Sequence, residues 1–219
     1  MLNYRKEGDV AVITMDDGKA NAVSHSYIDN LNDGLDRAEG EAQALVLQGR
    51  SGVFSAGFDL KEIGKGPIES KALVDKGAAL LLRLFSLPMP VVAASAGHAI
   101  AAGALLMLAS DTRFGVGGDA KYGLNETAIG MTLPPFGLQI ALCRVSKRHQ
   151  TQAIIQASLY DAEGAQRAGF LDEIVSAEAL EQCALAKATE LAELPTEAYA
   201  AMKLDVRRDY IDIIAASLS

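Results

Sequence analysis

The segment Pro90-Val-Val-Ala-Ala-Ser-Ala-Gly-His-Ala-Ile-Ala-Ala-Gly103 decides the fold class. Its first part, 90–95, is a short apolar run that opens with a proline, and such a run predicts a buried strand. The small residues of 97–103 predict a tight turn, and the apolar run that continues to Ala109 predicts a buried helix. A buried strand that turns directly into a buried helix is typical of a parallel α/β sheet.

The same alternation of strand and helix extends outward from this segment. Apolar strands are predicted at 44–48 and 112–116, and an amphipathic helix is predicted at 69–86. The segment 50–57, rich in Gly and Ser, predicts a loop. The remaining predicted elements are a hairpin of 2–7 and 10–15 around Gly8-Asp9, a helix at 25–39 capped by Ser24, helices at 137–145, 147–159, 161–168, 177–192 and 196–217, and a strand at 170–175.

The order of these elements predicts one α/β domain. We find neither an internal repeat nor a linker, so a single domain is expected over 1–219. Its core is expected at about 1–175, and its C-terminal helices at about 176–219. Half of the residues are hydrophobic, which supports a large buried core.

Composition also excludes several classes of protein. The net charge of −8 disfavours nucleic acid or an anionic membrane as a partner. The N-terminus has no apolar signal segment, and the longest apolar run, 99–109, is too short to span a bilayer. Cys143 and Cys183 lie far apart and lack the spacing of metal ligands, so a metal site is not expected. We expect a reducing, cytoplasmic location for the protein.

Two loops carry the candidate chemistry. Both 52–62 and 96–105 follow an apolar strand and are built from small residues that expose backbone N–H groups. Side by side at the carboxyl ends of parallel strands, they could aim two N–H donors at one oxygen, as an oxyanion hole does. The alternative is that small residues only permit tight packing, and spacing alone leaves both interpretations open. His98 is expected to line a pocket or the core rather than to act as a general base.

Five blocks, in order along the chain, resemble the crotonase (enoyl-CoA hydratase/isomerase) superfamily. Phe54-Ser-Ala-Gly-Phe-Asp-Leu-Lys-Glu62 resembles its F-[SA]-A-G-x-D-[LI]-x-E segment, and 90–103 is similar to its P-V-I-A-A-V-x-G-x-A-x-G-G-G segment. The other three blocks are Lys19-Ala-Asn-Ala-Val23, Tyr122-Gly-Leu-Asn-Glu126 and 161–175. The resemblance implies an α/β spiral of ββα units with a helical C-terminal region, assembled as a homotrimer or a dimer of trimers.

The resemblance also implies the site residues. The N–H groups of Phe58 and Ala102 would form the oxyanion hole for an acyl-CoA thioester, and Glu126 would be the catalytic carboxylate. No cofactor is implied beyond the coenzyme A that forms part of the substrate. The residues expected along the coenzyme A are Lys19, Ala20, Ala22, Ala56, Asp59 and Leu60.

Two departures from the family pattern bear on the reaction. Family hydratases carry a second glutamate just after the glycine run, and this chain has Leu105 there. A lone carboxylate beside an oxyanion hole favours Δ3–Δ2 enoyl-CoA isomerisation, in which one glutamate moves a proton from C2 to C4. The alternatives are a weak hydratase, a thioester hydrolase or an acyl-CoA-binding subunit without turnover. The chain also ends at Ser219, earlier than is usual, which implies a roomier acyl pocket or an altered oligomer.

Overall fold

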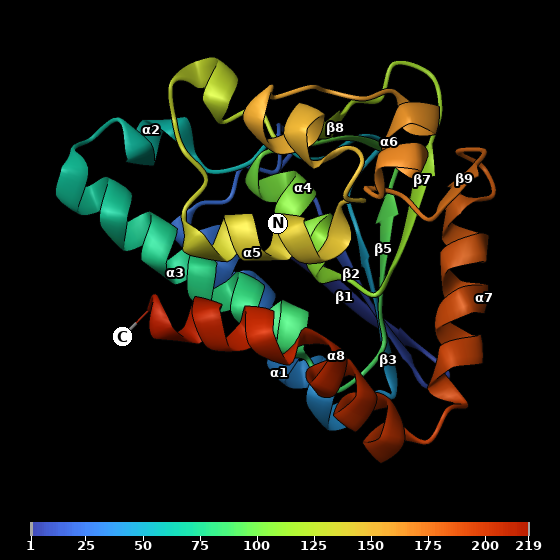
Figure 1. The fold of residues 1–219 in the computed structure, drawn as a ribbon. Helices are drawn as coiled ribbons and strands as arrows, with labels where there is room; N and C mark the ends of the chain where they lie inside the picture. Colours follow the sequence, from blue (N-terminus) through green and yellow to red (C-terminus); the bar gives the residue numbers. More distant parts are fainter. Residues whose placement is uncertain (1, 219) are drawn as a thin grey trace.

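The computed structural model describes residues 2–218, which form two β-sheets and the helices around them (Figure 1). In the larger sheet, β1 pairs antiparallel with β2, and the later neighbouring strands pair in parallel. The smaller sheet contains only parallel pairs. The larger sheet has the order β1 (Leu2–Glu7), β2 (Val10–Met15), β3 (Ala44–Gln48), β5 (Val91–Ser95), β7 (Thr112–Val116), β9 (Glu173–Val175), and the smaller β4 (Gly52–Ser55), β6 (Gly97–Ile100), β8 (Tyr122–Gly123).

The chain alternates between the two sheets and so winds as a spiral of ββα units. The first unit, β1, β2 and a helix, gives both strands to the larger sheet; each of the next three turns gives one strand to the larger sheet, one to the smaller sheet, and then one or more helices. This arrangement confirms the expected crotonase-like α/β fold. The successive turns are β3, β4, α2 (Leu60–Ile63) and α3 (Pro67–Ser86); β5, β6 and α4 (Ala102–Ala109); and β7, β8, a 3-10 turn (Thr127–Ile129) and α5 (Pro135–Arg144).

The prediction of a loop at 50–57 and a turn at 97–103 was partly wrong, because both segments contain strands of the smaller sheet. Gly52 pairs with Gly97 in the parallel ladder of β4 and β6. A Cβ added to Gly97 would lie 2.5 Å from the backbone nitrogen of Val53, closer than real Cβ atoms come. Glycine is therefore required for the two backbones to approach, and this requirement made a strand look like a turn.

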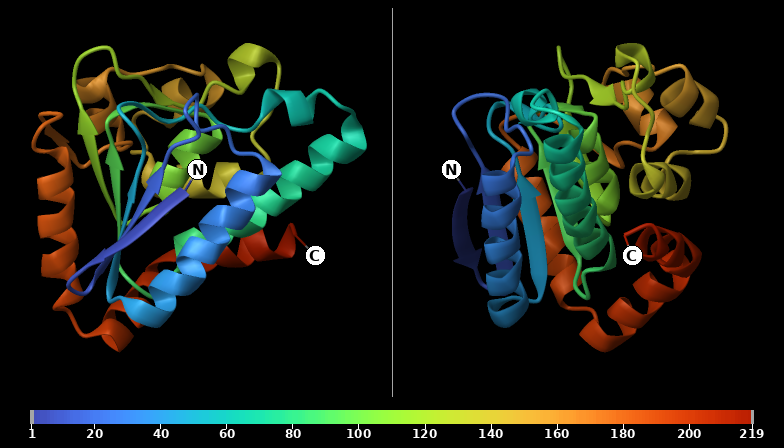
Figure 2. Two further views of the ribbon diagram at one scale, coloured as in Figure 1. Left: turned by 180° about the vertical axis from the view of Figure 1, so that it is seen from behind. Right: turned by 90° about the vertical axis from the view of Figure 1, so that its left-hand side faces the viewer.

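Helices cover both faces of the larger sheet (Figure 2). On one face, α1 (His25–Glu41) packs on β1 and β2 and lies beside α3. On the other face, α7 (Leu180–Ala192) packs on β2, β3, β5 and β7. Ser24 begins α1 as predicted, since its Oγ accepts a hydrogen bond from Tyr27 N at 3.2 Å.

The long helix predicted at 147–159 is wrong. The structure has only a short π-helical turn at Thr151–Ile155, and Ala157, with φ of +52°, takes a left-handed conformation that ends it. The helix α6 (Ala162–Ala168) follows, capped by Asp161. Within residues 2–218, no helix combines the length and apolar character that crossing a membrane requires.

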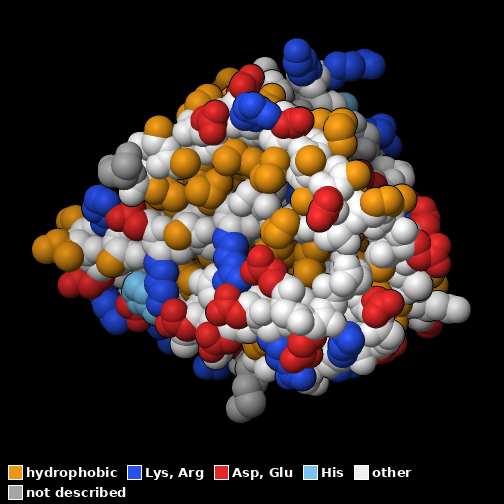
Figure 3. All heavy atoms as spheres, turned by 90° about the horizontal axis from the view of Figure 1, so that it is seen from below, with side chains coloured by type: hydrophobic (Ala, Val, Ile, Leu, Met, Phe, Trp, Pro, Cys, Tyr) orange, Lys and Arg blue, Asp and Glu red, His pale blue; other side chains and the backbone are white. Residues whose placement is uncertain are grey.

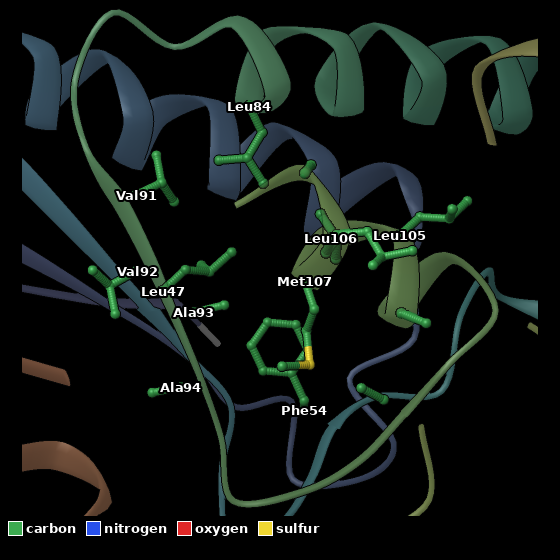
Figure 4. Packing of buried hydrophobic residues seen from close by; sticks show 14 of the residues in the cluster. Leu47, Phe54, Leu84, Val91, Val92, Ala93, Ala94, Leu105, Leu106 and Met107 are labelled. Carbon is green, nitrogen blue, oxygen red and sulfur yellow. The ribbon is translucent and has the colours of Figure 1, made fainter. Parts of the chain in front are cut away.

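The buried core lies between the larger sheet and α3 and α4. Leu47 of β3 and Val91 and Ala93 of β5 contribute from the sheet, and Leu84 contributes from α3 (Figure 4). Val92 and Ala94 point to the opposite face of the sheet, because side chains alternate along a strand. Leu105, Leu106 and Met107 of α4 fill the space beside Phe54. Because every residue of α4 is buried, its N-terminus is fixed at the carboxyl end of β6, the middle strand of the smaller sheet.

Two buried cations fix the C-terminal helix α8 (Thr196–Ala216) to the rest of the molecule. Lys203 Nζ donates to Leu87 O and Met89 O, both at 2.9 Å, just beyond the end of α3. Arg207 donates to Phe85 O at 2.6 Å. Both side chains also bind Asp111, at 2.7 Å each. These contacts satisfy carbonyl groups that the end of a helix leaves without partners.

Candidate active site

The loop after β4 touches the start of α4. A Cβ added to Gly57 would lie 2.8 Å from Cβ of Ala101 and 3.3 Å from the nitrogen of Ala102. Gly57 also has a φ of +94°, a conformation that favours glycine. The structure therefore brings together the two loops that the sequence singled out, with Phe58 and Ala102 at their contact.

The N–H of Phe58 is left free by its surroundings. A parallel bridge joins Val23 to Phe58, and it uses the hydrogen bonds Val23 N to Gly57 O (2.8 Å) and Asp59 N to Val23 O (3.1 Å). Successive N–H groups of an extended chain point in opposite directions, so the N–H of Phe58 points away from Val23. No backbone acceptor of this N–H is found among residues 2–218.

The N–H of Ala102 is available because Ala102 is the first residue of α4. Ala101, just before it, has φ of +54° and ψ of −126°, and its own N–H donates to Gly123 O at 3.0 Å. A left-handed φ at alanine costs about 1–3 kcal/mol, and the surrounding contacts must hold it. This turn allows the chain to pass from β6 into α4 with the Ala102 N–H at the junction.

Glu126 follows β8, the strand beside β6. Ile100 of β6 pairs with Gly123 of β8, so the segment that carries Glu126 starts next to Ala101. The Oε2 atom of Glu126 is buried and has no hydrogen-bond partner within the described part of the chain. Burial raises the pKa of Glu126, although hydrogen bonds from its own backbone and that of Asn125 oppose the rise. A buried carboxylate oxygen without a donor is costly and is typical of functional sites.

An alternative explanation for Glu126, that it complements a helix N-terminus capped by Asn125, has only the two backbone hydrogen bonds from Glu126 and Asn125 to its carboxyl in its favour. The helical element that begins there is the 3-10 turn Thr127–Ile129, and the Glu126 side chain makes no capping hydrogen bond to it. Asn125 Oδ1 is itself buried without a partner among the described residues.

Leu105 lies in α4, at the position where the resemblance described above implies a glutamate for a hydratase. Its side chain is 2% exposed. A Cβ added to Gly137 of α5 would lie 3.1 Å from Leu105 Cδ1, so the leucine packs against α5. The position therefore offers aliphatic carbon and no proton acceptor.

A cavity of about 470 Å³ lies against β4 and β6, lined there by Gly52, Val53, His98 and Ile100. Lys19, Ala20 and Ala56, three of the residues expected along coenzyme A, line it together. Other lining residues include Arg50, His98 and Lys121, of which sequence reasoning had considered only His98, as a pocket wall. The other three expected residues do not line this cavity: Ala22 faces a smaller one, Asp59 caps α2 through Lys61 N, and Leu60 is exposed.

Sequence reasoning also missed the role of Asn21. This residue is buried, with φ of +48°, and its Nδ2 donates to Met15 O at 2.8 Å and Phe54 O at 3.1 Å. Its carbonyl accepts a hydrogen bond from Ser55 Oγ at 2.7 Å. Asn21 thus ties the segment after β2 to β4. The sequence block that contains it pointed to the right segment, but these contacts join residues far apart in the chain.

Solved structures share this arrangement over almost the whole chain. An enoyl-CoA hydratase/isomerase family protein from Pseudomonas syringae is 38% identical, with a TM-score of 0.96 over 99% of this chain and 94% of that one. A structure of a protein from Mycobacterium tuberculosis, named there an enoyl-CoA isomerase, is 38% identical, with a TM-score of 0.95 over 99% of this chain and 95% of that one. A second structure of the same protein, named there a probable enoyl-CoA hydratase, is 39% identical, with a TM-score of 0.95 over 99% of this chain and 92% of that one. The fold is that of the crotonase superfamily.

Sequence comparison gives the family. A probable enoyl-CoA hydratase from Bacillus subtilis is 37% identical over 131 residues, which cover 58% of this chain and only 50% of that relative. The family model for enoyl-CoA hydratase/isomerase matches residues 5–218. This chain belongs to the enoyl-CoA hydratase/isomerase family.

Proposed function

We propose that this chain catalyses Δ3–Δ2 isomerisation of an enoyl-CoA thioester. The observation that carries the proposal is the buried Oε2 of Glu126, which lacks a hydrogen-bond donor among residues 2–218. At the second carboxylate position of the hydratases, buried Leu105 can neither accept nor donate a proton. The candidate site thus offers one proton shuttle and no second acid or base at that position.

In the proposed reaction, the Glu126 carboxylate removes a proton from C2 of the 3-enoyl thioester. The C–H electron pair moves into the C1–C2 bond and charge develops on the thioester oxygen, giving a dienolate. The N–H groups of Phe58 and Ala102 stabilise this oxygen, and one such donor is worth about 3–4 kcal/mol. Glu126 then returns the proton at C4, and the double bond ends between C2 and C3. The raised pKa of Glu126 suits both steps, because the group must take and release the same proton.

Hydration is the second candidate, because the relative from Bacillus subtilis is named a probable enoyl-CoA hydratase. Hydration needs one group to activate water and a second to deliver a proton to C2. The similar Mycobacterium tuberculosis protein is named an enoyl-CoA isomerase in one structure and a probable enoyl-CoA hydratase in another, so its names favour neither candidate.

The test is to supply 3-enoyl-CoA and 2-enoyl-CoA in separate reactions and to follow all products by chromatography. We expect 2-enoyl-CoA to form from the first substrate with a higher kcat/KM than 3-hydroxyacyl-CoA forms from the second. A higher kcat/KM for hydration of 2-enoyl-CoA than for isomerisation of 3-enoyl-CoA would favour a hydratase. Release of the free coenzyme A thiol would favour a thioester hydrolase. Tight binding of both esters without turnover would favour a non-catalytic acyl-CoA-binding subunit.

Arg50 is expected to bind the phosphate groups of coenzyme A. Arg50 lines the 470 Å³ cavity with Lys19 and Lys121, and its Nε lies 3.8 Å from Asp16 Oδ1, so these four residues together carry a net positive charge in a chain of net charge −8. We expect Arg50→Ala to raise KM for an acyl-CoA about tenfold with little change in kcat, because the contact is the same in ground and transition states. Steady-state kinetics measure both constants. The exposed Lys71 makes a matched control, since Lys71→Ala should change neither, and an unchanged KM in Arg50→Ala would remove Arg50 from the site.

Gly77 of α3 is expected to position the Phe58 amide. A Cβ on Gly77 would lie 2.6 Å from Phe58 Cζ, so alanine there must displace the ring. We expect Gly77→Ala to lower kcat by about tenfold to a hundredfold, because small misplacements of catalytic groups carry such costs. Phe58→Ala removes the ring and keeps the amide, so Gly77→Ala should have no further effect in that background.

Steady-state kinetics of the four proteins in this double-mutant cycle measure the coupling between the two positions. The control is Gly40→Ala in α1, where no atom lies within 4 Å, and it should leave kcat unchanged. A full loss of kcat on Gly77→Ala in the Phe58→Ala background would disprove the coupling.

A further inference from the structure

The turn between β6 and α4 holds an alanine in a conformation that alanine rarely adopts. Within residues 2–218, the non-glycine residues with a left-handed φ are Asn21, Ala101 and Ala157. Asparagine tolerates this conformation because its short polar side chain can hydrogen-bond locally, and alanine has no such compensation. Ala101 has φ of +54° and ψ of −126°, the angles of the first central residue of a type II′ turn, where glycine is usual. Strain of this kind persists where the surrounding structure fixes it, and it is typical of functional sites.

The methyl group of Ala101 packs against the loop that carries the Phe58 amide. A Cβ added to Gly57 would lie 2.8 Å from Ala101 Cβ, so the methyl lies directly against Gly57. Gly57 precedes Phe58 and Ala101 precedes Ala102, so this contact joins the two residues that come before the proposed oxyanion donors.

A second contact joins the same two segments through backbone atoms. A Cβ added to Gly103, the residue after Ala102, would lie 2.1 Å from Ser55 O, so the start of α4 approaches β4 closely there. Ser55 is fully buried, and its Oγ accepts a hydrogen bond from Gly57 N at 3.3 Å. With the backbone contact at Gly103 as a fixed point, the Ala101 methyl sets the width of the gap between the two amides.

A hydrogen bond also connects Ala101 to the strand that leads to the proposed base. The Ala101 N–H donates to Gly123 O of β8 at 3.0 Å, beside the pair of Ile100 and Gly123 in the ladder. Glu126 lies three residues after Gly123. Ala101 therefore joins the segments of the proposed site through its methyl group, its N–H and its peptide bond to Ala102.

We propose that Ala101 is a positioning residue, whose methyl group and left-handed backbone hold the Phe58 and Ala102 amides at the spacing that one thioester oxygen requires. The role is indirect, because Ala101 supplies neither amide. The proposal rests on the proposed function through its oxyanion hole, and it applies equally to isomerisation and to hydration of an enoyl-CoA.

Ala101→Gly removes the methyl and releases the strained φ while every backbone group stays in place. We expect kcat for 3-enoyl-CoA to fall at least about tenfold with little change in KM, because a small misplacement of catalytic groups weakens contacts made in the transition state. Ala157→Gly is the matched control, since it releases a left-handed φ of +52° at another half-buried alanine, in a turn that carries none of the proposed site groups. It should leave both constants unchanged.

The carbonyl stretch of a bound thioester reports on the oxyanion hole without turnover. Butyryl-CoA labelled with carbon-13 at its carbonyl is the probe, because a saturated acyl chain can be neither isomerised nor hydrated. Isotope-edited infrared spectra should show this band at lower wavenumber when the probe binds the unmodified chain or Ala157→Gly, since two N–H donors polarise the carbonyl. We expect Ala101→Gly to lose at least about half of that shift.

Fold and assembly are measured on the same three proteins. Ala101 is bonded to β8, which lies toward the top of the molecule in Figure 1. Figure 3 shows the molecule from below, where charged and apolar side chains are mixed over the surface, and Ala101→Gly leaves this face unchanged. Sedimentation should therefore be the same for all three proteins. Urea unfolding should show no loss of stability, because relief of the strained φ offsets the greater freedom that glycine gives the unfolded chain.

Three outcomes would overturn the role of Ala101. The first is an unchanged kcat in Ala101→Gly, and the second is a carbonyl shift equal to that of the unmodified chain, even where kcat falls together with stability. The third is the absence of any carbonyl shift in the unmodified chain, which would remove the oxyanion hole itself. A different result separates the proposed function from this inference. If the unmodified chain did not isomerise 3-enoyl-CoA but Ala101→Gly still reduced the carbonyl shift, isomerisation would fail and the role of Ala101 would stand.

Discussion

Glu126→Gln is expected to lower kcat for enoyl-CoA isomerisation by about a thousandfold, within the range that general acid–base catalysis supplies. The amide keeps the shape of the carboxylate but cannot accept the proton from C2. Binding of the thioester should change little, because the N–H groups of Phe58 and Ala102 are backbone groups that the substitution leaves in place. Steady-state kinetics with 3-enoyl-CoA measure kcat and KM separately.

The same substitution is expected to stabilise the fold at pH 7. Burial raises the pKa of Glu126 in the folded state, so the contribution of this carboxyl to stability is complete below its unfolded-state pKa. That contribution is lost as pH rises through the folded-state pKa. The stability advantage of the Glu126→Gln variant over the native chain should therefore grow with pH across this window and then level off. Urea unfolding of both proteins at a series of pH values measures it.

Activity should show the matching pH dependence. A general base must be ionised, so kcat/KM is expected to rise with pH around a midpoint above the ordinary carboxyl pKa. Glu163→Gln, at an exposed position of α6, is the matched control and should leave both kcat and the pH profile unchanged. A Glu126→Gln variant that kept more than about a tenth of the isomerase activity would rule out Glu126 as the base.

Asp111→Asn is expected to cost about 3–5 kcal/mol of unfolding free energy, the usual cost of leaving a buried charge without its partner. Asp111 Oδ1 binds Arg207 and Oδ2 binds Lys203, each at 2.7 Å, and Oδ2 also accepts from Val91 N at 2.8 Å. The neutral amide leaves both cations of α8 without a counter-charge. For a chain of this size, the loss corresponds to a fall in Tm of roughly 10 °C.

The matched control for this change is Asp75→Asn, which breaks the exposed pair of Lys71 and Asp75 on α3. Exposed pairs of this kind contribute about 0–1 kcal/mol, so urea unfolding should detect little change. A cost below about 1 kcal/mol for Asp111→Asn would mean that the carbonyl groups at the ends of α3 and α4 hold Lys203 and Arg207 without the carboxylate.

The centre of the larger sheet could be predicted from the sequence because β2, β3 and β5 are nearly continuous apolar runs. The segments 44–48 and 112–116 match β3 and β7. The smaller sheet could not be predicted, because β4 and β6 are short and open with glycine, and β8 has two residues. Glycine there serves close approach between two backbones, a relationship between distant segments that local patterns do not contain.

Different signals underlie the candidate site. Motif spacing pointed to Phe58, Ala102 and Glu126, and the structure places the two loops of the amides in contact. Motif spacing could not indicate Arg50, because a positively charged residue after a strand is most often a solvated surface residue. The cluster of Asp111, Lys203 and Arg207 left no pattern in the sequence, since these residues come together only when α8 folds back onto α3 and α5.

The alternation of the chain between its two sheets gives the candidate site a modular plan. Each turn of the spiral delivers one component in chain order: Phe58 after β4, Ala102 after β6 and Glu126 after β8. During synthesis, the emerging chain therefore acquires both proposed oxyanion donors before it acquires the base. An insertion or deletion within one turn would also move the site residue of that turn along the smaller sheet, while the strands of the larger sheet kept their register. The three short strands, rather than the main core, are thus where natural variation or redesign can retune the reaction geometry.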